Sequence, residues 1–135
     1  MSDFPINWLA ILVAVIVKQA LGALWFSPVL FFKQWSVLTG VTDSEMKTIL
    51  PKALIPDIVG ALIMAIVLDH AVHYAGARTV TQGAAVGLFS WLGFIAVATI
   101  GSVTFERRPF KLYLINNGVI LLALLIMGAI LAAWP

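Results

Sequence analysis

The residues of this sequence best suited to chemistry are ionisable side chains inside apolar segments. Lys18 stands in the apolar run 6–26, and Asp57 stands near the start of the run 54–74. At membrane depth a charged group is costly unless it is paired, hydrated or able to reach an interface. Two antiparallel helices would place these groups about 7 Å apart along the axis, which the long lysine side chain can bridge. We therefore expect Lys18 to pair with Asp57.

Uncharged polar residues are expected at the same depth as this pair. They are Gln19, Thr99, Ser102, Asn116 and Asn117. Together with the pair they would line a pathway or site for a polar solute or ion. The alternative is a buried network that only clamps the helices together, each bond being worth about 1 kcal/mol. Adjacent asparagines diverge by about 100° around a helix, so one of them would face away from the bundle centre, for example toward an oligomer interface.

A second ionisable cluster, Asp69, His70 and His73, falls at the other end of the run 54–74. Asp69 and His73 are four residues apart and share a helix face, which suits a proton relay or two ligands of a metal site. Apart from Asp3 the sequence offers no third ligand nearby, so we expect no metal. The alternative is a set of hydrated residues at a helix end.

Several classes of function are excluded or disfavoured. The chain has no cysteine, which excludes disulfides and thiol chemistry. It contains no phosphate-binding loop, nucleophile–base pair or carboxylate dyad, so we expect neither an enzyme nor a cofactor. A formal net charge of +2 is too small for a nucleic-acid partner.

The elements that must position these residues are membrane-spanning helices. Of the 135 residues, 62% are hydrophobic and 10% charged, whereas soluble domains have about 25% charged residues. A hydrocarbon layer of about 30 Å takes roughly 20 apolar residues to cross. Four segments qualify: 6–26, 54–74, 80–104 and 110–134. The sequence predicts an all-α integral membrane four-helix bundle, forming one domain over 1–135 with the lipid bilayer as its surroundings.

Charge around the spans predicts the orientation. The loops 27–53 and 105–109 with their flanks carry six basic residues, whereas the loop between the second and third spans has only Arg78. The six are Lys33, Lys47, Lys52, Arg107, Arg108 and Lys111. Because basic residues favour the cytoplasmic side, we expect a multi-pass protein of the inner (plasma) membrane with both termini outside the cytoplasm.

The sequence of the first loop, residues 29–52, predicts two short helices. Phe31, Phe32 and Trp35 recur at helical spacing in 29–39, as in a short helix lying in the membrane interface. Gly40 should end it, and the capping-box spacing of 42–45 should open another short helix that Pro51 stops. The aromatic face could bind a membrane-protein partner or act as a gate, or it could simply anchor the first span.

A glycine pattern and a basic turn each have two possible roles. Gly83 and Gly87 form a GxxxG pattern, which favours close helix packing either within the bundle or between subunits of a homo-oligomer. The turn 105–109 contains Glu106, Arg107 and Arg108, which could clamp an anionic headgroup or substrate, or could serve only to fix the topology.

Several motifs together carry a family resemblance. They are Asn7-Trp8-Leu9-Ala10, Gly22-Ala23-Leu24-Trp25-Phe26-Ser27-Pro28, Phe105-Glu106-Arg107-Arg108, Leu114-Ile115-Asn116-Asn117-Gly118 and Met127-Gly128-Ala129-Ile130. The chain resembles the bacterial domain of unknown function 1761 family over nearly its whole length. The resemblance implies a small four-helix membrane protein and supplies no activity, so function has to be argued from the residues.

Two functions remain for such a protein. The first is a small oligomeric transporter or channel for a small polar solute or ion, with the polar residues of the spans along its path. The second is a non-transporting accessory or structural subunit of a larger membrane complex. In the second case Lys18 and Asp57 would be structural, and Phe31, Phe32 and Trp35 would form the contact surface.

Overall fold

The computed structural model describes residues 5–134, and within that range the chain folds into helices without strands. Four helical segments are long and apolar enough to cross a membrane. They are α1 (Trp8–Trp25), α3 (Asp43–Tyr74), the interrupted segment Val80–Thr104 and α7 (Phe110–Ala133). The expected all-α fold is confirmed, and the four candidate spans identify a membrane protein.

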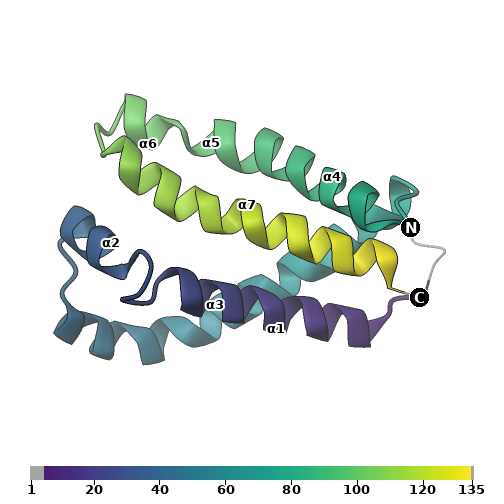
Figure 1. Cartoon of the computed structure of the whole chain (residues 1–135), viewed down its shortest axis with the longest axis horizontal. Coiled ribbons are helices and arrows are strands. Elements are labelled where there is room, and N and C mark those ends of the chain that lie inside the picture. Colours follow the sequence, from purple (N-terminus) through teal and green to yellow (C-terminus); the bar gives the residue numbers. More distant parts are fainter. Residues whose placement is uncertain (1–4, 135) are drawn as a thin grey trace.

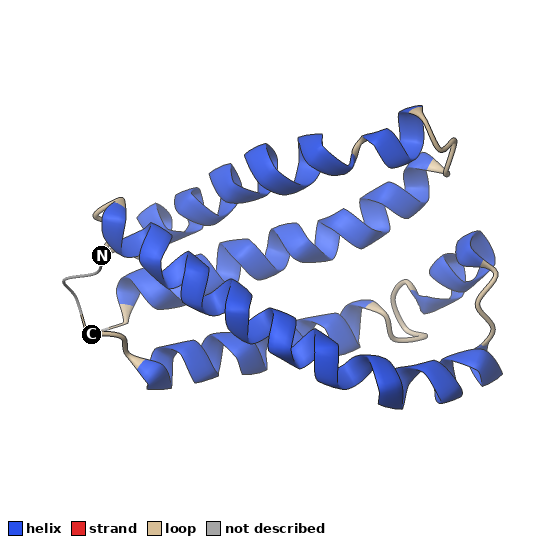
Figure 2. Ribbon diagram, turned by 180° about the vertical axis from the view of Figure 1, so that it is seen from behind, coloured by secondary structure: helices blue, strands red, loops and turns tan. Residues whose placement is uncertain are grey.

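Helix α7 is the centre of the arrangement. It packs against α1, α3 and α4 (Val80–Trp91), and Figure 1 shows it between α1 and α4 with α3 crossing behind. Figure 2 shows α3 from the other side, running across the bundle. The largest fully buried side chains, Ile11, Val72 and Met127, come from α1, α3 and α7. Helix α7 therefore occupies the centre of the bundle that the four candidate spans form.

The bundle has two chemically different ends, which lie at opposite sides of Figure 1. We call one the basic end, because it holds α2 (Phe32–Thr39), the start of α3 and the turn before α7, and thus the six basic residues counted above. We call the other the histidine end. It holds the turn between α3 and α4, together with the start of α1 and the end of α7.

Helix α3 departs from the sequence prediction. It runs unbroken for 32 residues, with Pro51 and Pro56 inside it, so the expected stop at Pro51 is wrong. Each proline removes one backbone donor, whereas ending the helix would leave several backbone groups without partners. Continuing the helix through the prolines therefore costs less than ending it. Its beginning is as predicted, since the Thr42 hydroxyl accepts a hydrogen bond from the Glu45 backbone N–H at 3.2 Å.

The third candidate span is interrupted. After α4 it continues as a π-helical turn, η1 (Leu92–Ala96), and then as two short helices, α5 (Val97–Thr99) and α6 (Gly101–Thr104). A π-helical turn widens the backbone and releases carbonyl groups from the regular hydrogen-bond ladder. Side chains from α5 and α7 reach these carbonyls, as described below.

The short helix expected in the first loop is present as α2. Gly40 ends it with φ of 78°, a left-handed conformation that glycine adopts without steric cost. Figure 1 shows α2 beside the first turns of α7, against which it packs. Because α2 lies beside the start of α7, side chains of these two helices contact one another at the basic end.

Candidate functional site

The structure brings Lys18 and Asp57 together between α1 and α3. The ammonium Nζ lies 4.0 Å from the carboxylate Oδ1, as expected for neighbouring antiparallel helices. That distance is an ion pair without a direct hydrogen bond, since such bonds are about 2.7–2.9 Å long. The side chain of Lys18 is 18% exposed and that of Asp57 is 56% exposed. The pair is therefore loose, and its negative member is open to the surroundings.

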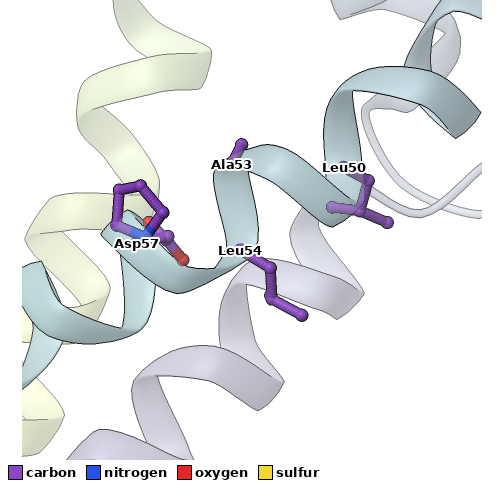
Figure 3. A pocket seen from close by; sticks show the side chains of 5 residues that line it. Leu50, Ala53, Leu54 and Asp57 are labelled. Atoms are coloured by element: carbon purple, nitrogen blue, oxygen red, sulfur yellow. The ribbon is translucent and has the colours of Figure 1, made fainter.

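A hollow of about 410 Å³ lies beside this carboxylate. Leu50, Ala53, Leu54, Pro56 and Asp57 line it, all from the basic half of α3. Figure 3 shows Leu50, Ala53, Leu54 and Asp57 spaced along this stretch of helix. The wall is mainly apolar with one carboxylate, so a small polar group could approach Asp57 while the rest of a solute contacts aliphatic side chains.

Gln19, the neighbour of Lys18 on α1, carries a buried amide Nε2 without a hydrogen-bond partner among the described residues. An unsatisfied buried donor typically costs about 1–3 kcal/mol. Such groups in a folded protein call for an explanation, and a binding role is one. Gln19 thus adds a donor next to the ion pair in sequence.

Asn117 forms a separate polar contact, between α7 and α5. Its side chain is buried and its Nδ2 donates to Thr99 Oγ1 at 3.1 Å, while Thr99 Oγ1 donates to the Ile95 carbonyl of η1 at 2.6 Å. Ser102, expected in the same group, makes no side-chain hydrogen bond to residues 5–134. Asn117 and Thr99 therefore secure the interrupted span to the central helix.

Asn116 points to a different helix, as the 100° divergence predicts. Its Oδ1 accepts a hydrogen bond from the indole Nε1 of Trp35 on α2 at 3.1 Å. Within the described chain no hydrogen bond or ion pair joins either asparagine to Lys18 or Asp57. The seven residues predicted for one site are therefore divided. Lys18 and Asp57 form an ion pair, with Gln19 next to Lys18 in sequence. Thr99, Asn116 and Asn117 hold α2 and α5 to α7, and Ser102 belongs to neither group.

Sequence reasoning missed the aromatic hydrogen bonds to backbone carbonyls. The indole N–H groups of Trp25 and Trp91 donate to the carbonyls of Ile115 and Asn117, both at 2.9 Å. Tyr113 Oη donates to the Ala96 carbonyl at the end of η1, at 2.6 Å. Buried indole and phenol groups need a hydrogen-bond acceptor. The sequence therefore predicts that these residues have acceptors, but it does not predict which groups accept.

The aromatic residues at the start of α2 contact the end of the first span in the same chain. Phe31, Phe32 and Trp35 are half-buried and turned toward this chain, with the Phe31 ring 4.5 Å from Trp25 and the Trp35 ring 5.9 Å from Phe26. Part of this face is therefore used within the chain, as the anchoring alternative expects, and binding of a partner there stays a prediction. The two ring pairs are tilted and edge-to-face, and edge-to-face contact is one of the arrangements that aromatic rings prefer.

At the histidine end the predicted shared face of Asp69 and His73 is confirmed. Their Oδ1 and Nδ1 atoms are 3.2 Å apart, and Asp69 is 3% exposed, with no hydrogen-bond partner for its Oδ2 among the described residues. His70 Nδ1 lies 2.8 Å from the Ile66 carbonyl. Asp3 lies outside the described residues, and within 5–134 no three His, Cys, Asp or Glu side chains gather as metal ligands. The pair remains a candidate proton site.

The glycine pattern acts inside the chain. A Cβ atom at Gly83 would overlap the carbonyl oxygen of Gly128, and one at Gly87 would overlap the carbonyl oxygen of Leu124. Only glycine allows the backbones of α4 and α7 to approach this closely. Of the two alternatives left open by the sequence, the structure supports packing within the bundle.

Four candidate spans with an ion pair and amide groups among them define a multi-pass helical membrane protein. The chain belongs to the family described as "Protein of unknown function (DUF1761)", which matches residues 9–132 and confirms the resemblance carried by the sequence motifs. No curated protein and no solved structure matches it. The family description supplies no activity, so a function has to come from the geometry above.

Proposed function

We propose that this protein is a small transporter or channel for a small polar solute or ion, with its solute site at Lys18 and Asp57. The observation that carries the proposal is the open ion pair. Two ionisable side chains on apolar helices stand 4.0 Å apart, and Asp57 borders the hollow on α3 while remaining more than half exposed. A pair that served only to clamp helices would gain more from a direct, enclosed contact.

The residues divide the work as follows. Lys18 offers its ammonium to an anionic or carbonyl-bearing solute, Asp57 positions that ammonium, and the unpartnered amide of Gln19 supplies a further donor. Asn116, Asn117 and Thr99 have a structural role in the proposal, since they hold α2 and α5 to α7. Proton transfer at Asp69 and His73 belongs to the proposal as a secondary role at the other end.

Assembly and orientation complete the proposal. Because α7 fills the interior of one chain, a path would form between copies, along the basic half of α3, whose residues from Asp43 to Gly60 are nearly all exposed. The basic end would face the cytoplasm of the inner (plasma) membrane by the positive-inside rule. Symmetric assembly is the usual way for small chains to enclose a site.

Flux through reconstituted protein tests the proposal. Liposomes containing the purified chain would be challenged with acetate, chloride and a pH gradient, each read by an internal dye. We expect flux of at least one species above empty liposomes, and a loss of that flux in the Lys18→Gln/Asp57→Asn variant. The matched control, Asp43→Asn/Lys47→Gln, removes one charge of each sign from exposed positions of the same end and should leave the flux intact.

The alternative is an accessory subunit of a larger membrane complex. The observation that favours it is that Trp25, Trp35, Trp91 and both asparagines make their hydrogen bonds within the chain, as purely structural groups would. Absence of flux, together with co-purification of a membrane protein at fixed stoichiometry, would decide for the accessory subunit. Undiminished flux in correctly assembled Lys18→Gln/Asp57→Asn protein would remove these residues from the path.

A further inference from the structure

Two lysines from distant parts of the sequence meet at the basic end. A hollow of about 290 Å³ is lined by Lys33, Gln34, Val37 and Leu38 of α2 and by Lys111 in the first turn of α7. The lining residues of α2 are spaced so that they share one helix face. The opposite face carries Phe32 and Trp35, and Trp35 contacts Phe26 and Asn116 of the bundle.

The two lysines are held together by contacts that do not involve their charges. The hydrogen bond between Trp35 and Asn116 ties α2 to α7, and the Trp35 ring packs against Phe26. Helix α2 therefore keeps a fixed register on α7, with Lys33 facing the same hollow as Lys111. Two like charges at one hollow repel each other, so the arrangement favours occupation by an anion.

Charge balance within the chain is not the explanation. Neither Lys33 nor Lys111 is in an ion pair with any residue of the described part of the chain. The amide of Gln34 adds another donor at the rim. The hollow thus presents positive charge and hydrogen-bond donors without a carboxylate among its lining residues.

The rest of the wall is apolar and lies at the end of the spans. Val37 is 83% exposed beside the lysines, and Leu38 is half-buried. A soluble anion would leave this surface in contact with water, whereas a phospholipid would cover it with glycerol and acyl groups while its phosphate lies between the ammonium groups. We infer that the hollow is a binding site for the headgroup of an acidic phospholipid.

The test compares lipid binding by the purified full-length chain in neutral detergent, measured by native mass spectrometry and by the shift of the unfolding temperature. The probes are dioleoyl phosphatidylglycerol, dioleoyl phosphatidylcholine and inorganic phosphate. We expect the wild type to prefer phosphatidylglycerol and the Lys33→Gln/Lys111→Gln variant to bind it roughly 30-fold more weakly at low salt. Lys47→Gln/Lys52→Gln, which removes the same charge from the same end, should bind as the wild type does, and Lys33→Arg should retain binding.

Three outcomes would overturn the inference. Equal weakening in the two double variants would mean general attraction to the basic end without a site. Equal binding of phosphatidylcholine would remove the role of the lysines. Displacement of the lipid by inorganic phosphate at equal concentration would identify a soluble anion as the ligand.

Discussion

Lys18 and Asp57 differ in surroundings although they form one pair. The lysine side chain is mostly buried, at 18% exposed, while the carboxylate is 56% exposed. If Lys18 is lost, Asp57 can still be hydrated from the hollow. If Asp57 is lost, the ammonium of Lys18 has no carboxylate partner and little access to water, which is the costlier situation.

Mutational stability should reproduce this asymmetry. We expect Asp57→Asn to lower the free energy of unfolding by about 2 kcal/mol and Lys18→Met by about 1 kcal/mol or less, with much of the loss recovered in the double variant. Thermal unfolding of the three variants in detergent measures the coupling. If the losses simply add, the two residues do not act as a pair.

For single residues, the sequence predicts interaction partners within one span and between neighbouring spans, but not partners across the whole bundle. The pairing of Lys18 with Asp57 could be predicted from the distance of each residue to the same membrane face, because adjacent spans are antiparallel. The acceptors of Trp25, Trp91 and Tyr113 are backbone carbonyls on other helices, and their identity depends on the axial register of helices that composition does not determine. The inward turn of Trp35 has the same cause.

Among the elements, α3 and the α4–α7 pair follow different rules. Helix α3 tolerates Pro51 and Pro56 because each removes a single donor, a local loss that a continuous helix in apolar surroundings can bear. The α4–α7 pair instead depends on missing side chains at Gly83, Gly87 and Gly128. The proline rule of soluble proteins thus predicted a helix end at Pro51 that does not exist, whereas the GxxxG pattern correctly predicted a close helix contact.

The close approach of α4 and α7 predicts a sharp difference between glycines. Gly83→Ala should lower the free energy of unfolding by about 1–3 kcal/mol, because the new methyl group would overlap the Gly128 carbonyl and the Ala132 side chain. Gly60→Ala, on α3 with open space around it, should leave stability unchanged or slightly higher. Detergent unfolding curves compare the two, and equal effects would argue against the packing described.

For the whole molecule, the two ends set how the protein would sit in a membrane. Tryptophan and tyrosine mark the histidine end at Trp8, Tyr74 and Trp134, and aromatic residues mark the basic end at Trp25 and Phe110, as in the interfacial belts of membrane proteins. The number of spans and their limits at three of the four followed from hydropathy. The interruption by η1 did not, because a π-helical turn leaves the apolar pattern almost unchanged.

The orientation can be measured because the chain has no native cysteine. We expect Ala75→Cys, in the turn at the histidine end, to react with a membrane-impermeant maleimide in intact cells, and Thr48→Cys, on the exposed start of α3, to react only after the membrane is opened. The reverse pattern of labelling would place the basic end outside the cytoplasm.

The glycine contact between α4 and α7 also limits how this protein can change shape. Backbones that touch at Gly83, Gly87 and Gly128 leave no flexible side chains between them to absorb sliding, so we expect these two helices to move together. Helix α3, in contrast, lacks ladder donors at Pro51 and Pro56, and its half nearest the basic end is packed against little else. We therefore expect any change in the hollow lined by Leu50, Ala53 and Leu54 to come from bending of α3 at its two prolines, while the α4–α7 body stays still.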